Sequence, residues 1–139
     1  ILSIDIDGND YWILKELIDI APDVIICEYN SLLGSQKSLT IKYDENFLRE
    51  NYSTNKINYG ASIQAIHKIL KNQYFLVYGN SFGNNVFYVN KKYQGLIKEK
   101  TTQECYKEIT FNELTHLKNS PNEFEKKKKL IDLSKFEDV

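Results

Sequence analysis

The sequence lacks several features that would place it in a definite class of protein. Its two cysteines, Cys27 in an apolar segment and Cys105 in a polar one, are too few for a disulfide framework, so we expect a reduced, cytoplasmic setting. No apolar run approaches the ~20 residues that a membrane-spanning helix needs, and no basic flank marks a signal peptide. We therefore expect no contact with a membrane.

The 139 residues also contain no methionine, and the chain begins at Ile1 inside an apolar strand pattern. A primary translation product begins with methionine, so we expect this chain to be a processed or truncated piece.

Charge of one sign is not in excess, since 18 basic residues face 19 acidic ones and the net charge is −1. This balance argues against a general nucleic-acid binder. Only one of the basic residues is an arginine. This bias in composition predicts nothing about function. The 42% of hydrophobic residues is enough for a packed core, which excludes wholesale disorder.

The first thirty residues predict a strand, a helix and a second strand. Residues 1–6 alternate like a strand and meet turn formers at 7–10, where Asn9 or Asp10 can cap a helix. Apolar residues then recur at helical spacing to residue 18, and Pro22 ends the pattern. The apolar run 24–27 is typical of a strand in a parallel sheet, which completes a βαβ unit.

The middle of the chain predicts a long connection followed by a hairpin. Residues 31–58 show scattered turn formers and are interpreted as a functional loop. Apolar residues of 63–70 form one helical stripe, for which Ser62 is the expected N-cap. Strands are predicted at 74–78 and 86–89, and their seven-residue link is too short for a parallel crossover, so we expect an antiparallel pair.

Beyond Tyr93 the composition becomes polar. We divide the chain into an α/β domain at 1–93 and a polar, helical extension at 94–139. Within that extension, Phe111, Leu114 and Leu117 fit one helical face, and Lys126–Lys129 form a basic run that reads as a solvated helical face.

Polar side chains follow both predicted parallel strands, where ligands bind in open α/β sheets. Asp5 and Asp7 are two residues apart and point to one side of the first strand, and Glu28 and Asn30 follow the second. Such oxygens can share a Mg²⁺ ion. In the competing interpretation, Asp7 only closes the turn and Glu28 pairs with a lysine.

Other motifs are absent. The sequence has no zinc spacing, no nucleophile elbow, no Walker loop and no Gly-x-Gly-x-x-Gly fingerprint. His67 lies one position from an apolar stripe and His116 lies in the polar extension, so structural roles are favoured for both.

The segment Ile4–Asn9 resembles the first motif of haloacid dehalogenase-type phosphatases, an apolar strand followed by Asp-x-Asp-Gly-Thr. This resemblance implies that Asp5 is a nucleophile and Asp7 a general acid. Asn9 stands in place of the threonine. Where that family's Mg²⁺ loop has carboxylates, this sequence has Asn80, Asn84 and Asn85.

A second resemblance covers residues 1 to about 93. The segment Leu2–Trp12 is similar to the fourth-strand region of Rossmann-like S-adenosylmethionine-dependent methyltransferases, closest to the FkbM-like group, and Val24–Asn30 to their fifth strand. The helix after Tyr59 and the two later strands match the last helix and the closing antiparallel pair. The implied fold is α/β: the C-terminal half of a Rossmann-like methyltransferase sheet, with parallel strands, a closing antiparallel β-hairpin and a polar helical tail.

The second resemblance implies methyl transfer from S-adenosylmethionine to an oxygen of a sugar or another small polar acceptor. It implies a metal, for which Mg is the candidate, at Asp7, Glu28 and Asn30. Catalytic roles fall to Asp7, Asp10 and His67, and cofactor contacts to Asp5 and Gly8. The loop at 31–58 becomes an acceptor lid, and the residues expected against the acceptor are Tyr29, Asn30, Tyr43, Tyr59 and Asn80.

The Gly-rich loop that holds the cofactor in this family is not in the sequence. We therefore expect the chain to be inactive alone and its cofactor-binding N-terminal half to be missing. The alternative from another class is a non-enzymatic interaction module, which would pair through the strand edge at 2–6 with a second copy or with the missing half.

Overall fold

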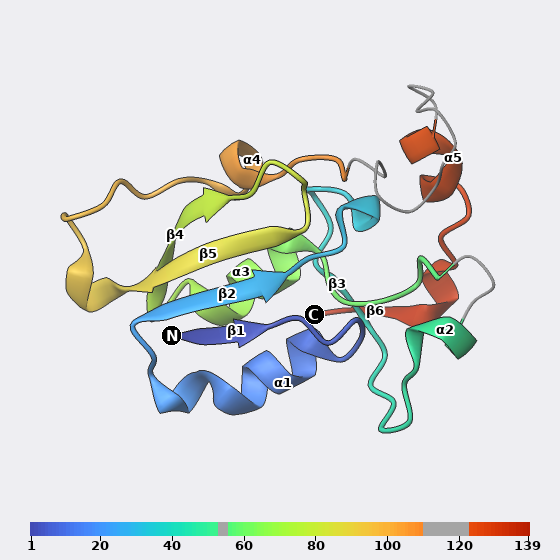
Figure 1. The fold of residues 1–139 in the computed structure, drawn as a ribbon, viewed down its shortest axis with the longest axis horizontal. Helices are drawn as coiled ribbons and strands as arrows, with labels where there is room; N and C mark the ends of the chain where they lie inside the picture. The colour runs from blue at the N-terminus through green and yellow to red at the C-terminus, as the bar shows by residue number, and fades with distance from the viewer. Residues whose placement is uncertain (53–55, 110–122) are drawn as a thin grey trace.

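A four-stranded mixed sheet forms the centre of the computed structural model, which describes residues 1–52, 56–109 and 123–139. Its strands are β1 (Leu2–Ile4), β2 (Val24–Glu28), β4 (Tyr74–Gly79) and β5 (Asn85–Asn90). The spatial order is β1-β2-β5-β4, as Figure 1 shows. β1 and β2 are parallel, while β5 is antiparallel to both β2 and β4. The predicted parallel βαβ unit and antiparallel pair are confirmed.

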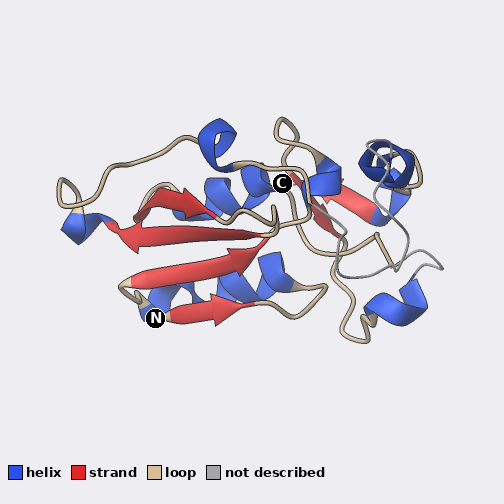
Figure 2. Ribbon diagram, turned by 45° about the horizontal axis from the view of Figure 1, so that its top comes forward, coloured by secondary structure: helices blue, strands red, loops and turns tan. Residues whose placement is uncertain are grey.

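Two amphipathic helices, α1 (Asp10–Leu17) and α3 (Ile63–Leu70), cover one face of this sheet (Figure 2). Leu14 and Ile66, one from each helix, join the main apolar core with Ile25 of β2. Ser62 caps α3 as predicted, because its hydroxyl oxygen accepts from the backbone N–H of Ala65 at 3.2 Å. The one-turn helix η1 (Ile18–Ile20) ends the first helical segment before Pro22.

The opposite face of the sheet is less covered. A row of paired residues crosses it from β1 to β4 through Ser3, Ile26, Phe87 and Tyr78. Ser3 is exposed, Ile26 and Phe87 are half-buried, and the Tyr78 side chain is 48% exposed. The two faces of the sheet therefore differ, because this row is partly exposed, although Val89 and Phe75 on the same face are buried.

A second, two-stranded sheet was not predicted. β3 (Leu39–Ile41) pairs antiparallel with β6 (Phe136–Asp138), and buried Ile41 and Phe136 belong to a separate small core. The segment expected as one irregular loop thus contains η2 (Ser31–Leu33), β3 and α2 (Arg49–Tyr52). A three-residue strand whose partner lies at the far end of the chain leaves no local periodicity to read.

The segment after Tyr93 returns to the body of the fold, although it was expected as a helical extension. After η3 (Lys91–Tyr93) come the short helices α4 (Thr102–Cys105) and α5 (Glu123–Lys128), then η4 (Leu133–Lys135) and β6. Cys105 is 2% exposed within the main core. A Cβ on Gly79 would lie 2.2 Å from the Cys105 carbonyl oxygen, so this return depends on a glycine.

The helical face proposed for Phe111, Leu114 and Leu117, together with His116, lies outside the described residues. Within the described ranges, every helix is too short or too polar to cross a bilayer.

Candidate functional site

Three carboxylates meet at the carboxyl ends of the parallel strands β1 and β2, and we call Asp5, Asp7 and Glu28 the acidic cluster. Their ligand oxygens all lie within 4.8 Å of one another. Asp5 and Asp7 are exposed, whereas Glu28 is 7% exposed. Carboxylate oxygens at this spacing can hold a hard divalent cation, with water or a ligand completing its shell.

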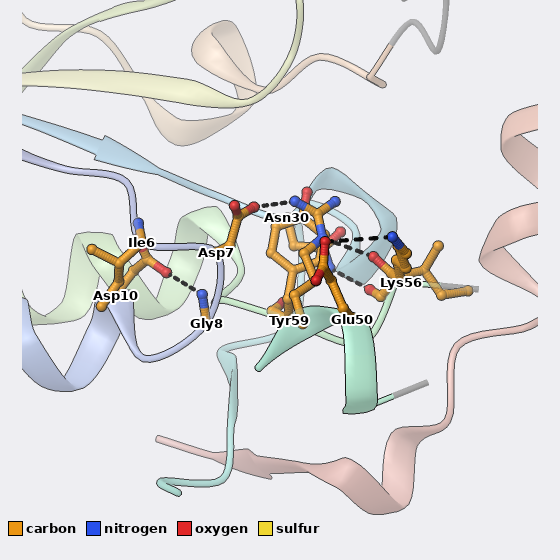
Figure 3. Close-up of polar contacts among 10 residues, drawn as sticks. Ile6, Asp7, Gly8, Asp10, Asn30, Glu50, Lys56 and Tyr59 are labelled. Carbon is orange, nitrogen blue, oxygen red and sulfur yellow. Dashed lines mark hydrogen bonds and ion pairs between the residues drawn. The ribbon is translucent and has the colours of Figure 1, made fainter. Parts of the chain in front are cut away.

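The turn that follows β1 leaves the Asp7 side chain exposed to solvent. The buried Asp10 side chain accepts from the backbone N–H of Ile6 at 2.9 Å and from that of Gly8 at 2.8 Å (Figure 3). Between them Asp7 has φ 60°, a left-handed conformation that aspartate tolerates better than most residues. Asp10 thus holds the turn, and both of its oxygens have backbone partners. Asn9, at the N-cap position of α1, makes no side-chain cap bond.

Glu28 has the most unusual environment in the acidic cluster. Its Oε2 atom is buried and has no hydrogen-bond partner among the described residues. Burial, reinforced by the negative charges of Asp5, Asp10 and Asp7, raises the pKa of Glu28 to about 8. Burial and the Asp7 charge likewise raise the pKa of Asp5. A buried polar atom without a partner is costly, and a cation on the cluster would supply one.

Arg49, at the start of α2, forms an ion pair with Asp7, which Figure 3 marks as a dashed line. Its guanidinium carbon lies 3.6 Å from the centre of the Tyr59 ring. The Nε–H group donates to the Lys56 carbonyl oxygen at 2.9 Å. No motif in the sequence singles out this residue, although it is the only arginine in the chain.

Asn30 was expected as a metal and acceptor ligand, but its side chain is already engaged. The Nδ2 group donates to the carbonyl oxygens of Ile57 at 2.9 Å and Tyr59 at 3.0 Å, and Oδ1 accepts from the Leu32 N–H at 3.0 Å. The residue is 1% exposed. Asn30 therefore joins the end of β2 to the segment at 57–59, and Asp5 takes the third place in the acidic cluster.

Tyr29 faces the main core instead of a ligand. It is 0% exposed, and its hydroxyl group both donates to the Lys107 carbonyl oxygen at 3.1 Å and accepts from the Lys107 N–H at 3.0 Å. Tyr43, the other expected wall residue of the lid, is 60% exposed and lies edge-on to Trp12. Of the three predicted tyrosines, Tyr59 alone contacts a residue bonded to the acidic cluster.

Asn80 organises the loop between β4 and β5. Its Oδ1 accepts from the backbone N–H groups of Gly83, Asn84 and Asn85, and its Nδ2 donates to Asn84 Oδ1 at 2.7 Å. Since Asn85 pairs with Glu28 in the sheet, this loop lies at the same end of the strands as the acidic cluster. The geometry gives Asn80 a structural task; an acceptor contact stays a prediction.

His67, predicted as a catalytic candidate, lies away from the acidic cluster. Its Nδ1 is 3.3 Å from the Tyr88 hydroxyl oxygen, and the charges that act on it belong to Lys71, Glu99 and Lys91. Burial, followed by the charge of Lys71, lowers the pKa of His67. None of the carboxylates in the cluster contributes to that shift.

Gly8 and Asp5, the two residues expected against S-adenosylmethionine, each have neighbours within the protein, and a contact with the cofactor stays a prediction. A Cβ on Gly8 would lie 2.2 Å from a ring carbon of Phe47, so the Phe47 ring covers this glycine. Asp5 belongs to the acidic cluster. Of these two residues, Asp5 thus lies in a group of carboxylates that could hold a metal ion.

The fold and site define a mixed α/β protein with an acidic cluster at the carboxyl edge of its parallel strands. Comparisons with family models, with curated proteins and with solved structures found no match to the chain.

Proposed function

We propose that this chain forms the acceptor-binding and cation-binding side of an S-adenosylmethionine-dependent O-methyltransferase domain. The acidic cluster carries the proposal, because three carboxylates converge at the carboxyl ends of β1 and β2 and one buried Glu28 oxygen has no partner in the part of the chain that the structure describes. A parallel βαβ unit followed by a closing antiparallel pair also agrees with the resemblance in the sequence. We propose in the same way that the four-stranded sheet is the C-terminal half of a Rossmann-like sheet.

Asp5, Asp7 and Glu28 would hold the cation, with Mg²⁺ as the natural candidate for an all-oxygen site. When bound, the ion supplies a lowered pKa for the acceptor hydroxyl group and fixes its orientation. Asp5 and Asp7 present their oxygens at the exposed side, where an acceptor can reach the same ion. Asp10 and Gly8 keep the turn that presents Asp7. No cofactor contact is assigned to these residues.

Titration with Mn²⁺, as a spectroscopically visible stand-in for Mg²⁺, tests the cation site. We expect the 139-residue chain to bind one ion, and Asp7→Asn and Glu28→Gln to weaken binding by at least about tenfold, as loss of a charged ligand predicts. Glu45→Gln is the matched control, because Glu45 is an exposed carboxylate outside the cluster. Equal affinity in all four proteins would overturn the proposal.

Calorimetric titration with S-adenosylmethionine tests which part of the proposed domain binds the cofactor. The proposal assigns the cofactor-binding strands to residues outside these 139, so this chain is expected to show no binding, and a longer chain that includes those strands is expected to bind. Micromolar binding by the 139 residues alone would overturn the assignment to the acceptor side.

The phosphatase alternative uses the same carboxylates, with Asp5 as nucleophile and Asp7 as general acid. It predicts Mg²⁺-dependent hydrolysis of p-nitrophenyl phosphate that Asp5→Asn abolishes. If the wild-type chain hydrolyses no p-nitrophenyl phosphate above the background rate, this alternative is excluded. The asparagine that would serve its metal loop, Asn80, already uses its side-chain oxygen on three backbone N–H groups.

The interaction-module alternative is favoured by one observation, since β1 is an edge strand of the four-stranded sheet. Pairing of a second copy along this edge predicts a dimer in light scattering. A monomer at micromolar concentration would count against it.

A further inference from the structure

We propose that Arg49 binds an oxyanion, the carboxylate or phosphate group of the ligand that the acidic cluster receives. This inference rests on the proposed cation site and narrows the acceptor from any polar molecule to one that carries an anionic group beside its reacting hydroxyl. Arg49 then acts as a specificity-determining residue.

The guanidinium plane of Arg49 is fixed by three contacts. It lies 3.6 Å from the centre of the Tyr59 ring, and Tyr59 is 4% exposed. The Tyr59 carbonyl oxygen accepts from buried Asn30, which ties this stacking surface to the end of β2. Nε donates to the Lys56 carbonyl oxygen, and Nη1 donates to Asp7. A guanidinium held in one plane loses little further freedom when it binds a planar or tetrahedral oxyanion.

Part of the guanidinium remains accessible beside the cluster. A guanidinium group has five N–H donors, and the bonds recorded among the described residues use its Nε and Nη1 atoms. The Arg49 side chain is 26% exposed, so a ligand can reach it. Because the neighbouring Asp7 belongs to the cation site, a group bound to the ion and a group bound to Arg49 can belong to one small ligand.

The charges of the loaded site leave two positive groups that an anionic ligand can contact together. The three carboxylates would be balanced by one divalent cation and the Arg49 guanidinium. The nearby charges of Lys56 and Glu50 face each other at 3.6 Å and leave this balance unchanged. An oxyanion that touches both positive groups gains charge-assisted hydrogen bonds and an ion contact together.

A simpler role for Arg49 is that of a counter-ion to Asp7. A lysine would neutralise Asp7 equally well, but it lacks the planar fork that stacks on Tyr59 and bonds to Lys56. The substitution Arg49→Lys therefore separates the two roles, since it keeps the charge and removes the fork.

Binding measurements on the Mn²⁺-loaded chain test the proposal, with inorganic phosphate and malonate as the two probes. We expect the wild-type chain to bind at least one of them, and Arg49→Lys and Arg49→Gln to weaken that binding by at least about tenfold, the usual loss for a bidentate pair. Lys37→Gln, at an exposed lysine outside the contacts of Arg49, is the control for general electrostatics and is expected to bind as the wild type does. Binding of phosphate alone assigns a phosphoryl ligand, and binding of malonate alone a carboxylate.

A second measurement needs no variant, because Arg49 is the only arginine in the chain. Phenylglyoxal modifies arginine, and mass spectrometry of the product reports on this one residue. We expect Mn²⁺ with the bound probe to slow the modification severalfold compared with Mn²⁺ alone. This result stays informative even if an Arg49 variant fails to fold.

Two results would overturn the proposal: neither probe binds to the Mn²⁺-loaded wild-type chain, or Arg49→Lys binds the probe as tightly as the wild type. In either case Arg49 is a counter-ion only. Failure of the chain to bind Mn²⁺ is a different result, which overturns the proposed cation site itself.

Discussion

Two sets of polar side chains lie at the same end of the four-stranded sheet, where β2 ends. They differ in how far their polar atoms are hydrogen-bonded within the protein. Asn30 and Asn80 have their side-chain oxygen and nitrogen atoms paired within the protein. The acidic cluster, in contrast, brings three carboxylates together and leaves a buried Glu28 oxygen without a partner within the described ranges. The single guanidinium near them pairs with Asp7, so it only partly balances the cluster.

This difference separates structural residues from candidate functional ones. Buried polar groups in folded proteins are normally paired, and an exception calls for an explanation such as a bound ion. The paired asparagines hold chain segments in place, and replacing them should affect stability. The acidic cluster, in which one buried Glu28 oxygen has no partner among the described residues, opposes folding in the absence of a cation, and replacing its carboxylates should affect ion binding. Four substitutions, Asn30→Ala, Glu28→Gln, Asn80→Ala and Asp7→Asn, test this contrast.

The largest effect on stability is expected from Asn30→Ala. The change removes one acceptor and two donor contacts, and it leaves the backbone groups of Leu32, Ile57 and Tyr59 unpaired in a buried place. We expect the free energy of unfolding to fall by about 3 kcal/mol, from about 1 kcal/mol or more for each lost buried partner. Urea unfolding measures this loss. Asn46→Ala, at an exposed asparagine, is the control, and an equal loss in both variants would contradict the structural role of Asn30.

The next effect concerns the pH dependence of stability at Glu28. Its pKa is about 8 in the fold, above the ordinary value of 4.5, so the folded state holds a proton that the unfolded state releases. This stabilising contribution is complete below pH 4.5 and is lost as the pH rises towards 8. We expect a loss on the order of 2 kcal/mol between pH 5 and pH 8, allowing for partial solvent access.

Glu28→Gln should flatten this slope and raise stability at pH 8, because the amide stays neutral. Urea unfolding at pH 5, 6.5 and 8 checks the slope, and Glu45→Gln, at an exposed site, should leave it unchanged. A wild-type chain that is as stable at pH 8 as at pH 5 would contradict the unpaired state of Glu28.

The parts of the fold that could be predicted from the sequence are those with local signals. The alternation before Asp7, the apolar run 24–27 and the short link between β4 and β5 defined the main sheet. The β3–β6 pair could not be found this way, because each strand has three residues and its partner is remote in sequence.

The site was predicted in part, because strand ends reveal where side chains gather but not how each is bonded. Asp7 and Glu28 were named, and Asp5 was assigned to the cofactor although its oxygens lie within reach of the other two. Asn30 was chosen for its position after β2, while its bonds go to residues 57 and 59 across a long connection. Arg49 was missed because its Asp7 partner lies 42 positions away.

The smallest effect is expected from Asn80→Ala in the loop between β4 and β5. The lost acceptor served three backbone N–H groups, but the site is only partly buried, so water can replace it. We expect a loss of about 1 kcal/mol in the free energy of unfolding, with faster amide exchange at residues 83–85. Asn80→Asp keeps an accepting oxygen and should retain most of the exchange protection.

Affinity for Mn²⁺ completes the comparison between the two sets. Asn80→Ala should leave it unchanged, since the side chain is not part of the acidic cluster, whereas Asp7→Asn should weaken it with little loss of stability because Asp7 is exposed. If each variant changes only one of the two properties, structural and ion-binding roles are divided between neighbouring residues at one end of the sheet. If Asn80→Ala weakened Mn²⁺ binding as much as Asp7→Asn does, the loop would belong to the ion site and the contrast drawn from hydrogen bonding would be wrong.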